Sequence, residues 1–589
     1  MTTTELIFSL FTLLGGLAFF LFGMNTMSSG LERMAGGKLE QLLKKMTSNP
    51  IKSLVLGAGI TIAIQSSSAM TVMLVGLVNS GVMQLGQTIG VIMGSNVGTT
   101  LTAWILSLAG IESEGNFFIE LLKPSNFSPL LAFIGILLIM GSKKQKRRDI
   151  GGILVGFAVL MFGMELMKEA MDPITKLDGF NDALTAFSNP LLGVLVGAVF
   201  TGVIQSSAAS VGILQTLSMS GGVTYGMALP IIMGQNIGTC VTALLSSIGV
   251  NKNAKKVSVV HISFNLIGTA VILAVFYGLH AIFKFAIVDQ PIDPFGIAIC
   301  HTIFNVVTTA LLLPFTKQLE KIANFVIKDD KDKKEEYTLV DHRLLSTPSV
   351  AIAQCYERTV SMAEVAHNTI LTVISLLGSY DKKKVDEIVK NEDELDAYED
   401  KLGTVLVQLS SKEISAADSK QVSKLLHTIG DFERLGDHGV NVLRVAQELY
   451  DKKIAFSPEA KAELEVLTNA LTEILEITVQ AFRAGDVALA VQVEPLEQVI
   501  DSLIIEIKAK HIARLKKGQC TIELGFILSD LLNDYARISD HCSNIAVALI
   551  EVEENHFDTH EYLNAVKKAD NPEFVAAFNS YKEKYALPK

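Results

Sequence analysis

Long apolar segments separated by short polar loops occupy the first 316 residues of the chain. They lie at residues 5–26, 53–110, 128–141, 151–171, 191–249, 257–284 and 295–316. A helix needs about 20 apolar residues to cross a hydrocarbon core of about 30 Å. The pattern therefore predicts a bundle of membrane helices, in which residues 53–110 and 191–249 are each long enough for more than one helix.

The pattern changes after a charged linker, which we place at residues 317–345. Apolar residues then recur every three or four positions, which is typical of amphipathic helices. Six such segments follow, at residues 349–377, 383–410, 417–450, 458–484, 487–517 and 521–554. Six long helices with short connections predict two three-helix bundles in a soluble domain at residues 346–555. Residues 556–589 are expected to form a C-terminal tail.

Charge divides the chain at the same place. Residues 1–316 contain 17 Lys and Arg and 14 Asp and Glu, whereas residues 317–589 contain 33 and 47. No Asp, Glu, Lys, Arg or His occurs between Ser53 and Ile111, or between Ala183 and Val250, which excludes an ordinary soluble enzyme for the first part. Neither part shows a nucleophile with a neighbouring base, so we predict no enzymatic activity.

The net charge and the cysteine content argue against several classes of partner and site. A net charge of −11 without a basic, aromatic-rich surface argues against nucleic acid. The five cysteines form no CxxC pair, so neither a disulfide framework nor a thiolate zinc site is predicted. The N-terminus lacks the basic flank and cleavage site of a secretory signal, and we interpret it as a retained first membrane helix.

The membrane part contains a repeat with an offset of 140 residues. This shift matches polar residues and glycines that apolar composition alone does not explain. The matching elements are Phe22-Gly23-Met24 with Phe162-Gly163-Met164, Asn49-Pro50 with Asn189-Pro190, Gln65-Ser66-Ser67 with Gln205-Ser206-Ser207, and Gly94, Asn96, Gly98, Thr99 and Thr102 with Gly234, Asn236, Gly238, Thr239 and Thr242. We assign repeat 1 to residues 1–140 and repeat 2, with additional helices, to residues 141–316.

Loop charges predict that the two repeats lie upside down relative to each other. Residues 27–52 contain five basic and two acidic side chains, whereas the matching residues 165–190 contain five acidic side chains and two lysines. Basic loops stay in the cytoplasm. The chain is therefore expected in a bacterial inner membrane, with its N-terminus outside and everything from residue 317 onward in the cytoplasm. Inverted repeats with broken or re-entrant helices are typical of secondary transporters.

The Gln-Ser-Ser tracts interrupt matching apolar segments of the two repeats, which favours a substrate site. Hydroxyl and amide groups at a broken helix offer many hydrogen-bond donors to a small oxyanion such as phosphate. The predicted anion ligands are Gln65, Ser66, Ser67, Ser68, Gln205, Ser206 and Ser207. Arsenate and other oxyanions fit the same chemistry.

An anion bound among these uncharged segments needs a counter-ion, because an uncompensated charge in a low dielectric is costly. A sodium ion held by neutral oxygens provides it. The candidate sodium ligands are Gln65, Gln205, Asn96, Thr99, Thr100, Asn236 and Thr239. Proton coupling is less natural, since the charge-free runs contain no carboxylate or imidazole. The alternative is that these polar residues only join packed helices.

The two tracts, each followed about 30 residues later by Gly-x-Asn-x-Gly-Thr, resemble the duplicated signature of the type II sodium-phosphate cotransporter family. The resemblance covers roughly residues 5–316. It implies sodium-coupled transport of inorganic phosphate and anion contacts from the serines of both tracts. The second copy has Ala208 where the first has Ser68, so the resemblance implies no hydroxyl contact at that position.

Carboxylates four residues apart recur in the soluble part, where they share a helix face. They are Glu392, Asp396, Glu433, Asp437, Glu497, Asp501 and Asp540, with Ala536 in place of the eighth. Two such pairs on adjacent helices suit a divalent cation, iron or manganese, and the alternative is a solvated acidic face.

The motif Glu433-Arg434-x-x-Asp437-His438 and its counterpart around Asp540-His541 resemble the PhoU family of phosphate-regulatory proteins over roughly residues 345–555. The resemblance implies a regulatory domain that binds metal at the carboxylates. His438 and His541 are either ligands or surface residues. A homodimer and a regulatory partner bound through this domain are further alternatives.

The sequence as a whole predicts a sodium-coupled phosphate transporter that works by alternating access under the control of a cytoplasmic PhoU-like domain. Two alternatives remain: an exporter of phosphate, and a membrane sensor that binds phosphate and signals through the soluble domain.

Overall fold

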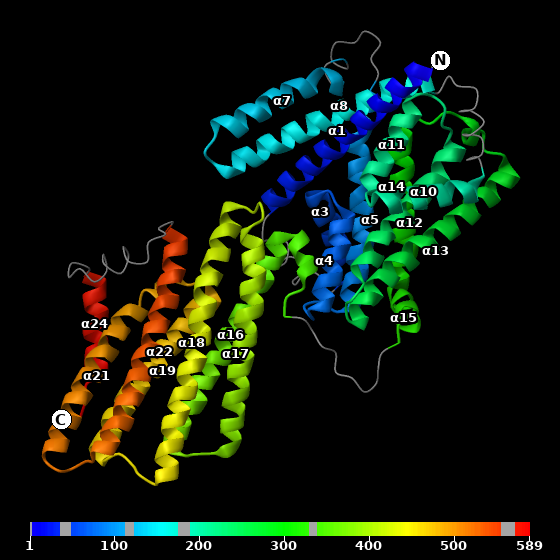
Figure 1. Cartoon of the computed structure of the whole chain (residues 1–589). Helices are drawn as coiled ribbons and strands as arrows, with labels where there is room; N and C mark the ends of the chain where they lie inside the picture. Colours follow the sequence, from blue (N-terminus) through cyan, green and yellow to red (C-terminus); the bar gives the residue numbers. More distant parts are fainter. Residues whose placement is uncertain are drawn as a thin grey trace. The chain divides into compact units, whose positions relative to one another are not determined.

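The computed structural model describes residues 3–35, 49–111, 120, 123–174, 189–328, 339–554 and 572–588. Within these ranges the chain is helical and forms no β-strand (Figure 1). It divides into two compact units, residues 1–351 and 352–589. The all-helical fold predicted from the sequence is confirmed.

The first unit contains the two repeats, and their helices match one for one. The bounds in repeat 1 are α1 Thr3–Ala35, α3 Pro50–Ile64, α4 Ser67–Asn79 and α5 Leu85–Ser107, and in repeat 2 they are α8 Gln145–Ile174, α10 Pro190–Ile204, α11 Ser207–Met219 and α12 Tyr225–Ser246. Additional helices are α7 Pro124–Gly141, α13 Lys252–Phe283, α14 Pro294–Leu312 and α15 Thr316–Val326. In the described part of this unit, seven helices are long and apolar enough to cross a membrane: α1, α5, α7, α8, α12, α13 and α14.

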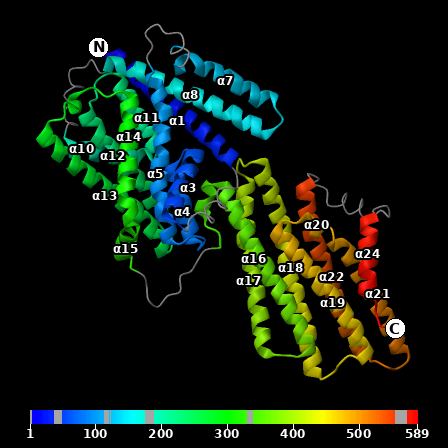
Figure 2. The same ribbon diagram turned by 180° about the vertical axis from the view of Figure 1, so that it is seen from behind.

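Helices α1 and α8 lie side by side in both views (Figures 1 and 2) and cross at glycines. A Cβ atom on Gly16 would lie 2.9 Å from the carbonyl oxygen of Gly163, and one on Gly156 would lie 2.8 Å from that of Gly23. The 140-residue offset relates Gly16 to Gly156 and Gly23 to Gly163, so it converts the first contact into the second. Because the residue number rises along one helix as it falls along the other, the helices are antiparallel, and the pseudo-two-fold axis that relates them is perpendicular to both. This is the geometry of an inverted repeat.

Each Gln-Ser-Ser tract forms the tip of a helical hairpin. Glycines on α5 contact α3 in parallel register, since Gly90 approaches Pro50 and Gly98 approaches Ala58. Helix α4 starts at the tract and ends at Asn79, shortly before α5 begins, so it runs back against α3 and α5. Helices α10, α11 and α12 repeat this arrangement. The sequence left open a hairpin or a broken helix, and the structure has hairpins.

Helix α15 lies in the region predicted to be a linker. Leu319 and Ala323 are buried on its apolar face, and the helix packs against α13 and α5. The segment also contains the charged residues Lys317, Glu320 and Lys321. Because these residues alternate with apolar ones along the sequence, we predicted a charged linker and not an amphipathic helix.

The second unit contains the six long helices predicted for it. They are α16 Pro348–Gly378, most of which lies in this unit, α17 Lys382–Ser410, α18 Ala416–Lys452, α19 Pro458–Ala484, α21 Val493–Lys516 and α22 Ile522–Glu554. A short α20 (Val487–Ala490) precedes α21, so the single helix predicted at 487–517 is broken. Pro495 explains the break at residues 491–492, because proline has no N–H to donate to the carbonyl of Val491 four residues earlier, and its ring crowds that carbonyl. The expected tail contains α24 (Pro572–Lys584), which packs on α21.

The glycine crossing yields a stability prediction. A Cβ atom on Gly23 would lie 2.3 Å from the backbone nitrogen of Leu160, whereas one on Gly15 would have nothing within 4 Å. Gly23→Ala is therefore expected to lower the free energy of unfolding by roughly 1–3 kcal/mol, because backbone cannot give way. Gly15→Ala should leave it unchanged or raise it slightly. Equal thermal unfolding midpoints for the two variants in detergent would contradict this packing.

Candidate functional site

Both hairpin tips have the same backbone geometry. Gln65 has φ 53° and ψ 28°, and Gln205 has φ 58° and ψ 22°, so both are left-handed. This region is unusual for a residue other than glycine, and such strain is concentrated at functional sites. Ser66 and Ser206 follow as the N-caps of α4 and α11, and their hydroxyl oxygens accept the N–H groups of Ala69 and Ala209 at 3.1 and 3.2 Å.

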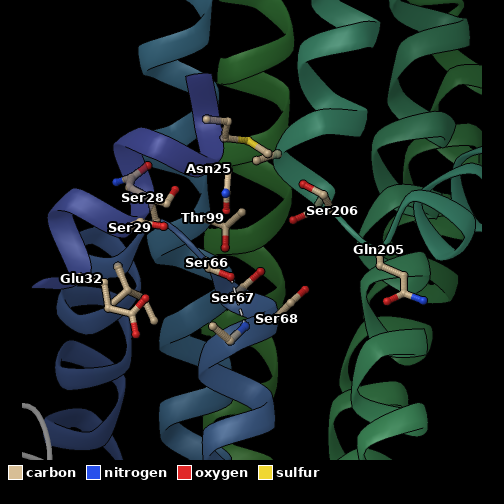
Figure 3. A pocket seen from close by; sticks show the side chains of 16 residues that line it. Asn25, Ser28, Ser29, Glu32, Ser66, Ser67, Ser68, Thr99, Gln205 and Ser206 are labelled. Carbon is tan, nitrogen blue, oxygen red and sulfur yellow. Dashed lines mark hydrogen bonds between the residues drawn. The ribbon is translucent and has the colours of Figure 1, made fainter. Parts of the chain in front are cut away.

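The two tips meet at one cavity of about 280 Å³. Its lining comes from α1, both tips and α5 (Figure 3). The lining residues are Met24, Asn25, Ser28, Ser29, Glu32, Ile64, Gln65, Ser66, Ser67, Ser68, Ala69, Thr99, Gln205, Ser206, Ser207 and Ala208. All seven residues predicted as anion ligands therefore border the same space, although they come from segments 140 residues apart.

The two hairpin tips favour an anion at their side of the cavity. The N-termini of α4 and α11 both lie at it, and each contributes partial positive charge and backbone N–H groups. The Ser66 and Ser206 oxygens already accept capping hydrogen bonds, so their hydroxyl protons are available to a ligand. None of the described lining residues is Lys or Arg. The site therefore offers dipoles and hydroxyl groups without a compensating cationic side chain.

The two glutamines differ in their environment. The Gln65 amide donates to the Ile62 carbonyl at 2.7 Å, and its oxygen accepts the Thr102 hydroxyl at 2.8 Å. Gln65 is buried, whereas Gln205 is exposed, and the hydroxyl of Thr242, the counterpart of Thr102, makes no hydrogen bond. The first tip is thus held by its side chain and the second is open, so the symmetry of the backbone does not extend to the side chains.

The predicted sodium ligands do not gather in one place. Thr99 lines the cavity with Gln65 and Gln205. The other four side chains lie outside the cavity lining and donate hydrogen bonds to their own or a neighbouring helix. Asn96 donates to Asn265 of α13 at 3.2 Å, and Thr100, Asn236 and Thr239 donate to carbonyls of their own helices. For these four residues the packing alternative describes the observed contacts.

A polar stripe on α1 borders the cavity and was not among the predicted ligands. Asn25, Ser28, Ser29 and Glu32 lie on one side of it, with the first tip between them and Ser206 in Figure 3. Their spacing of three and four places them on one helix face. That spacing in an otherwise apolar helix was visible in the sequence. Glu32 adds a carboxylate to a cavity expected to hold an anion.

In the second unit, Glu392, Asp396 and Asp437 bring carboxylate oxygens within 4.8 Å of one another. Burial and the carboxylate of Asp396 raise the pKa of Glu392, and burial and Asp437 raise that of the neighbouring Glu433. Arg434 offsets part of this repulsion through an exposed contact with Asp437 at 3.1 Å. The cluster has the oxygen donors and excess negative charge that suit a hard cation.

The second predicted cluster is not assembled in the same way. Glu497 is buried, Asp501 is exposed, and Asp540 pairs with Arg537 at 3.2 Å. Among the described residues, only the first cluster meets the geometric requirement for a metal site. Ala536 stands where the first bundle has Glu433, which lies outside the first cluster, so the difference rests on how Glu497, Asp501 and Asp540 are placed and not on this replacement.

The two histidines next to the clusters face each other between α18 and α22. The Nδ1 atom of His438 lies 2.9 Å from Asp534, and that of His541 lies 2.8 Å from Asp431. The imidazole centroids are 5.5 Å apart. These reciprocal contacts join the two bundles, so both histidines have a structural role that explains their presence in each copy.

The sequence matches the Na+/Pi-cotransporter family over residues 19–169 and 175–289, and the PhoU domain over residues 359–446 and 464–549. The Bacillus subtilis protein YqeW, which is uncharacterized, is 31% identical over 256 residues, covering 43% of this chain and 78% of that protein. YjbB of Escherichia coli K12, named as a candidate inorganic phosphate export protein, is 24% identical over 563 residues, covering 94% of this chain and all of YjbB.

Two further comparisons are local. Sodium-dependent phosphate transport protein 2A of Rattus norvegicus is 38% identical over 108 residues, which are 18% of this chain and 17% of that protein. The crystal structure of PhoU from Pseudomonas aeruginosa matches 35% of this chain and 96% of that chain, with 18% identity and a TM-score of 0.32.

The carboxylate cluster yields a prediction about metal and pH. Because the pKa values of Glu392 and Glu433 are raised, their contribution to stability is present at low pH and is lost as the pH rises through those values. At pH 7, Mn²⁺ is therefore expected to raise the thermal unfolding midpoint of the full chain. The gain should shrink as the pH falls toward the raised pKa values, because protonated carboxylates do not bind metal.

Calorimetry of two variants separates this site from general acidity. Asp396→Asn should lose the gain from Mn²⁺, whereas Asp501→Asn, an exposed acid of the second bundle, should keep it. An equal gain in both variants would contradict metal binding at the first cluster.

Proposed function

Because the membrane part of this chain belongs to the Na+/Pi-cotransporter family and its C-terminal part consists of PhoU domains, we propose that it carries inorganic phosphate across the bacterial inner membrane coupled to sodium. It is a multi-pass membrane protein of a transporter family. The proposal adds the coupling ion, the site and the mechanism. Movement of one repeat against the other would expose the central cavity to each side in turn.

The observation that carries this proposal is the meeting of both hairpin tips at one cavity. Phosphate needs donors from several directions, and the tips supply two helix N-termini and the hydroxyl groups of Ser66, Ser67, Ser206 and Ser207. Since the tips belong to oppositely oriented repeats, motion of one repeat changes both halves of the site together. An anion bound there is held only while both halves are in place.

In this proposal, a sodium ion supplies positive charge between the phosphate and the Glu32 carboxylate. Phosphate beside the Glu32 carboxylate would be strongly disfavoured in a low dielectric without a cation between them. We place a sodium ion on the α1 side of the cavity, with Glu32 and the hydroxyl groups of Ser28 and Ser29 as ligands and Thr99 and Gln65 toward the phosphate. Hard oxygen donors of this kind suit a small monovalent cation.

Export is the second candidate direction. The name of YjbB, which aligns along its whole length, favours it. A coupled carrier moves in whichever direction the combined sodium and phosphate gradients favour, and no residue of the cavity fixes that direction. A sensor that binds phosphate without transporting it is distinguished by flux, because it would show binding without turnover.

The PhoU domains would adjust transport to phosphate status. The carboxylate cluster of Glu392, Asp396 and Asp437 would hold a divalent metal in this role. This places regulation in the soluble unit and ion binding in the membrane unit, consistent with the division of the chain into two compact parts.

Purified protein in liposomes tests the coupling. Phosphate flux driven by a sodium gradient is expected, and it should disappear when potassium replaces sodium on both sides. Ser66→Ala and Ser206→Ala should each reduce the flux by about tenfold or more, because each removes a donor from the anion. Ser246→Ala, whose hydroxyl bonds only to the Ala243 carbonyl, is the matched control. Undiminished flux in potassium would contradict sodium coupling.

A separate pair of variants tests the cation site. Glu32→Gln keeps the size of the side chain and removes its charge, so the sodium concentration for half-maximal flux should rise by about tenfold. Glu165→Gln changes a similarly half-buried carboxylate on α8 that does not line the cavity. Its sodium dependence should match that of the wild type. Equal sodium dependence in all three proteins would remove Glu32 from the site.

A further inference from the structure

The end of α4 remote from the cavity is covered by a short segment of the chain. This segment is η4 (His342–Ser346), which lies at the end of the region predicted as a charged linker and leads into α16. Leu344 of η4 is fully buried, and η4 packs against α4. Asp341, the residue that precedes η4, is 2% exposed. One 13-residue helix therefore carries half of the anion site at its first residue and a buried contact with η4 at its last.

The contact depends on a residue without a side chain. A Cβ atom on Gly76 would lie 2.8 Å from Leu344 Cδ2, so glycine makes room for the leucine. The corresponding residue of α11 is Thr216, which would fill that space. Asn79, whose counterpart is Met219, donates to Asp341 at 2.6 Å. The surface that receives η4 therefore exists on α4 and not on its repeat partner α11.

Polar contacts fix the same end of α4 to α13. The backbone N–H of Asn251, the N-cap of α13, donates to the Asn79 side chain at 2.8 Å, and its amide donates to the Asn79 carbonyl at 3.1 Å. Arg343 bridges Asp341, at 3.1 Å, and the carbonyl of Ile248 between α12 and α13. Thus η4, α4 and α13 are joined at a single buried cluster.

We propose that η4 is an inhibitory latch. While Leu344 and Asp341 are docked, α4 is held against α13, and Ser66, the N-cap about 20 Å from Asn79 along the helix, cannot move with the anion. Transport requires η4 to leave α4. Because η4 continues into α16 and so into the PhoU-like unit, a change in that unit would release or restore the latch through the backbone. This proposal rests on the transport function proposed above.

Loosening the contact from either side is expected to speed transport by the full chain. Leu344→Ala removes the buried side chain, and Gly76→Ala pushes it out of its place. Each should raise the maximal flux at saturating phosphate and sodium about twofold or more, since a lost buried leucine contact shifts a docking equilibrium by roughly tenfold or more. Half-saturation by phosphate should stay unchanged. Gly59→Ala on α3, with nothing within 4 Å of its added Cβ, should behave as the wild type.

A cross-link tests the opposite state. The Cβ position of Gly76 lies 3.8 Å from Asp341 Cβ, which suits a disulfide in the double variant Gly76→Cys/Asp341→Cys. Oxidation should suppress flux, and a reducing agent should restore it. Wild type and both single variants, treated alike, account for the five native cysteines. Because the added Cβ at position 76 and the loss of the Asp341 carboxylate both loosen the contact, the two single variants and the reduced double variant should show the raised flux expected of Gly76→Ala, and only oxidation of the double variant should suppress it.

Transport measurements with these proteins separate the two claims. Flux that is unchanged by the cross-link, or is equal to or below that of the wild type in folded Leu344→Ala and Gly76→Ala proteins, would overturn the latch and leave the transport function standing. Absence of sodium-dependent flux in every protein, including the reduced double variant, would contradict the transport function itself and the latch with it.

Discussion

The cost of removing a charged anion from water is the constraint on which the membrane unit depends. If the cavity holds phosphate, as we propose, its described lining, which contains no Lys or Arg, must stabilise the anion with dipoles, hydroxyl groups and a second ion. The paired hairpins provide the first two, because each places a helix N-terminus and a serine cap at the centre of the unit. The uncharged segments and the strained glutamines at 65 and 205 are two consequences of one requirement, which is to present backbone N–H groups to an anion away from bulk solvent.

Some features of the site are related by the repeat symmetry, and others distinguish one repeat from the other. The glycine crossing of α1 and α8 and the repeated hairpins follow from duplication. Three features of the described chain distinguish repeat 1: the fixed side chain of Gln65, the lining of the cavity by the polar stripe that ends at Glu32, and the Gly76 surface that receives η4. Anion contacts are therefore shared between the repeats, whereas the proposed cation site and latch lie on one side. In a carrier built this way, regulation would act on the half of the site that repeat 1 contributes, and the half from repeat 2 would be unaffected.

The internal repeat and the apolar periodicity predicted the hairpin tips and most helices. Contacts between residues far apart in the sequence were not predicted, because they arise only when the helices pack. Glycine and serine at matching offsets located both hairpin tips, and apolar spacing located the six long soluble helices. Asn96 and Asn236 share those offsets, yet the Asn96 amide donates to Asn265 of α13 and the Asn236 amide to a carbonyl of its own helix, because spacing alone does not say which face meets the cavity. The latch joins Asn79 to Asp341, 262 positions later, and no local pattern signals a contact between them.

The central claim is that two tracts form one anion site. The number of phosphate ions bound per chain tests it most directly, measured by equilibrium binding of radiolabelled phosphate to purified protein in saturating sodium. The account predicts one phosphate per chain, with binding lost in Ser66→Ala and also in Ser206→Ala. Two phosphates per chain, or a single site that survives either substitution, would contradict it.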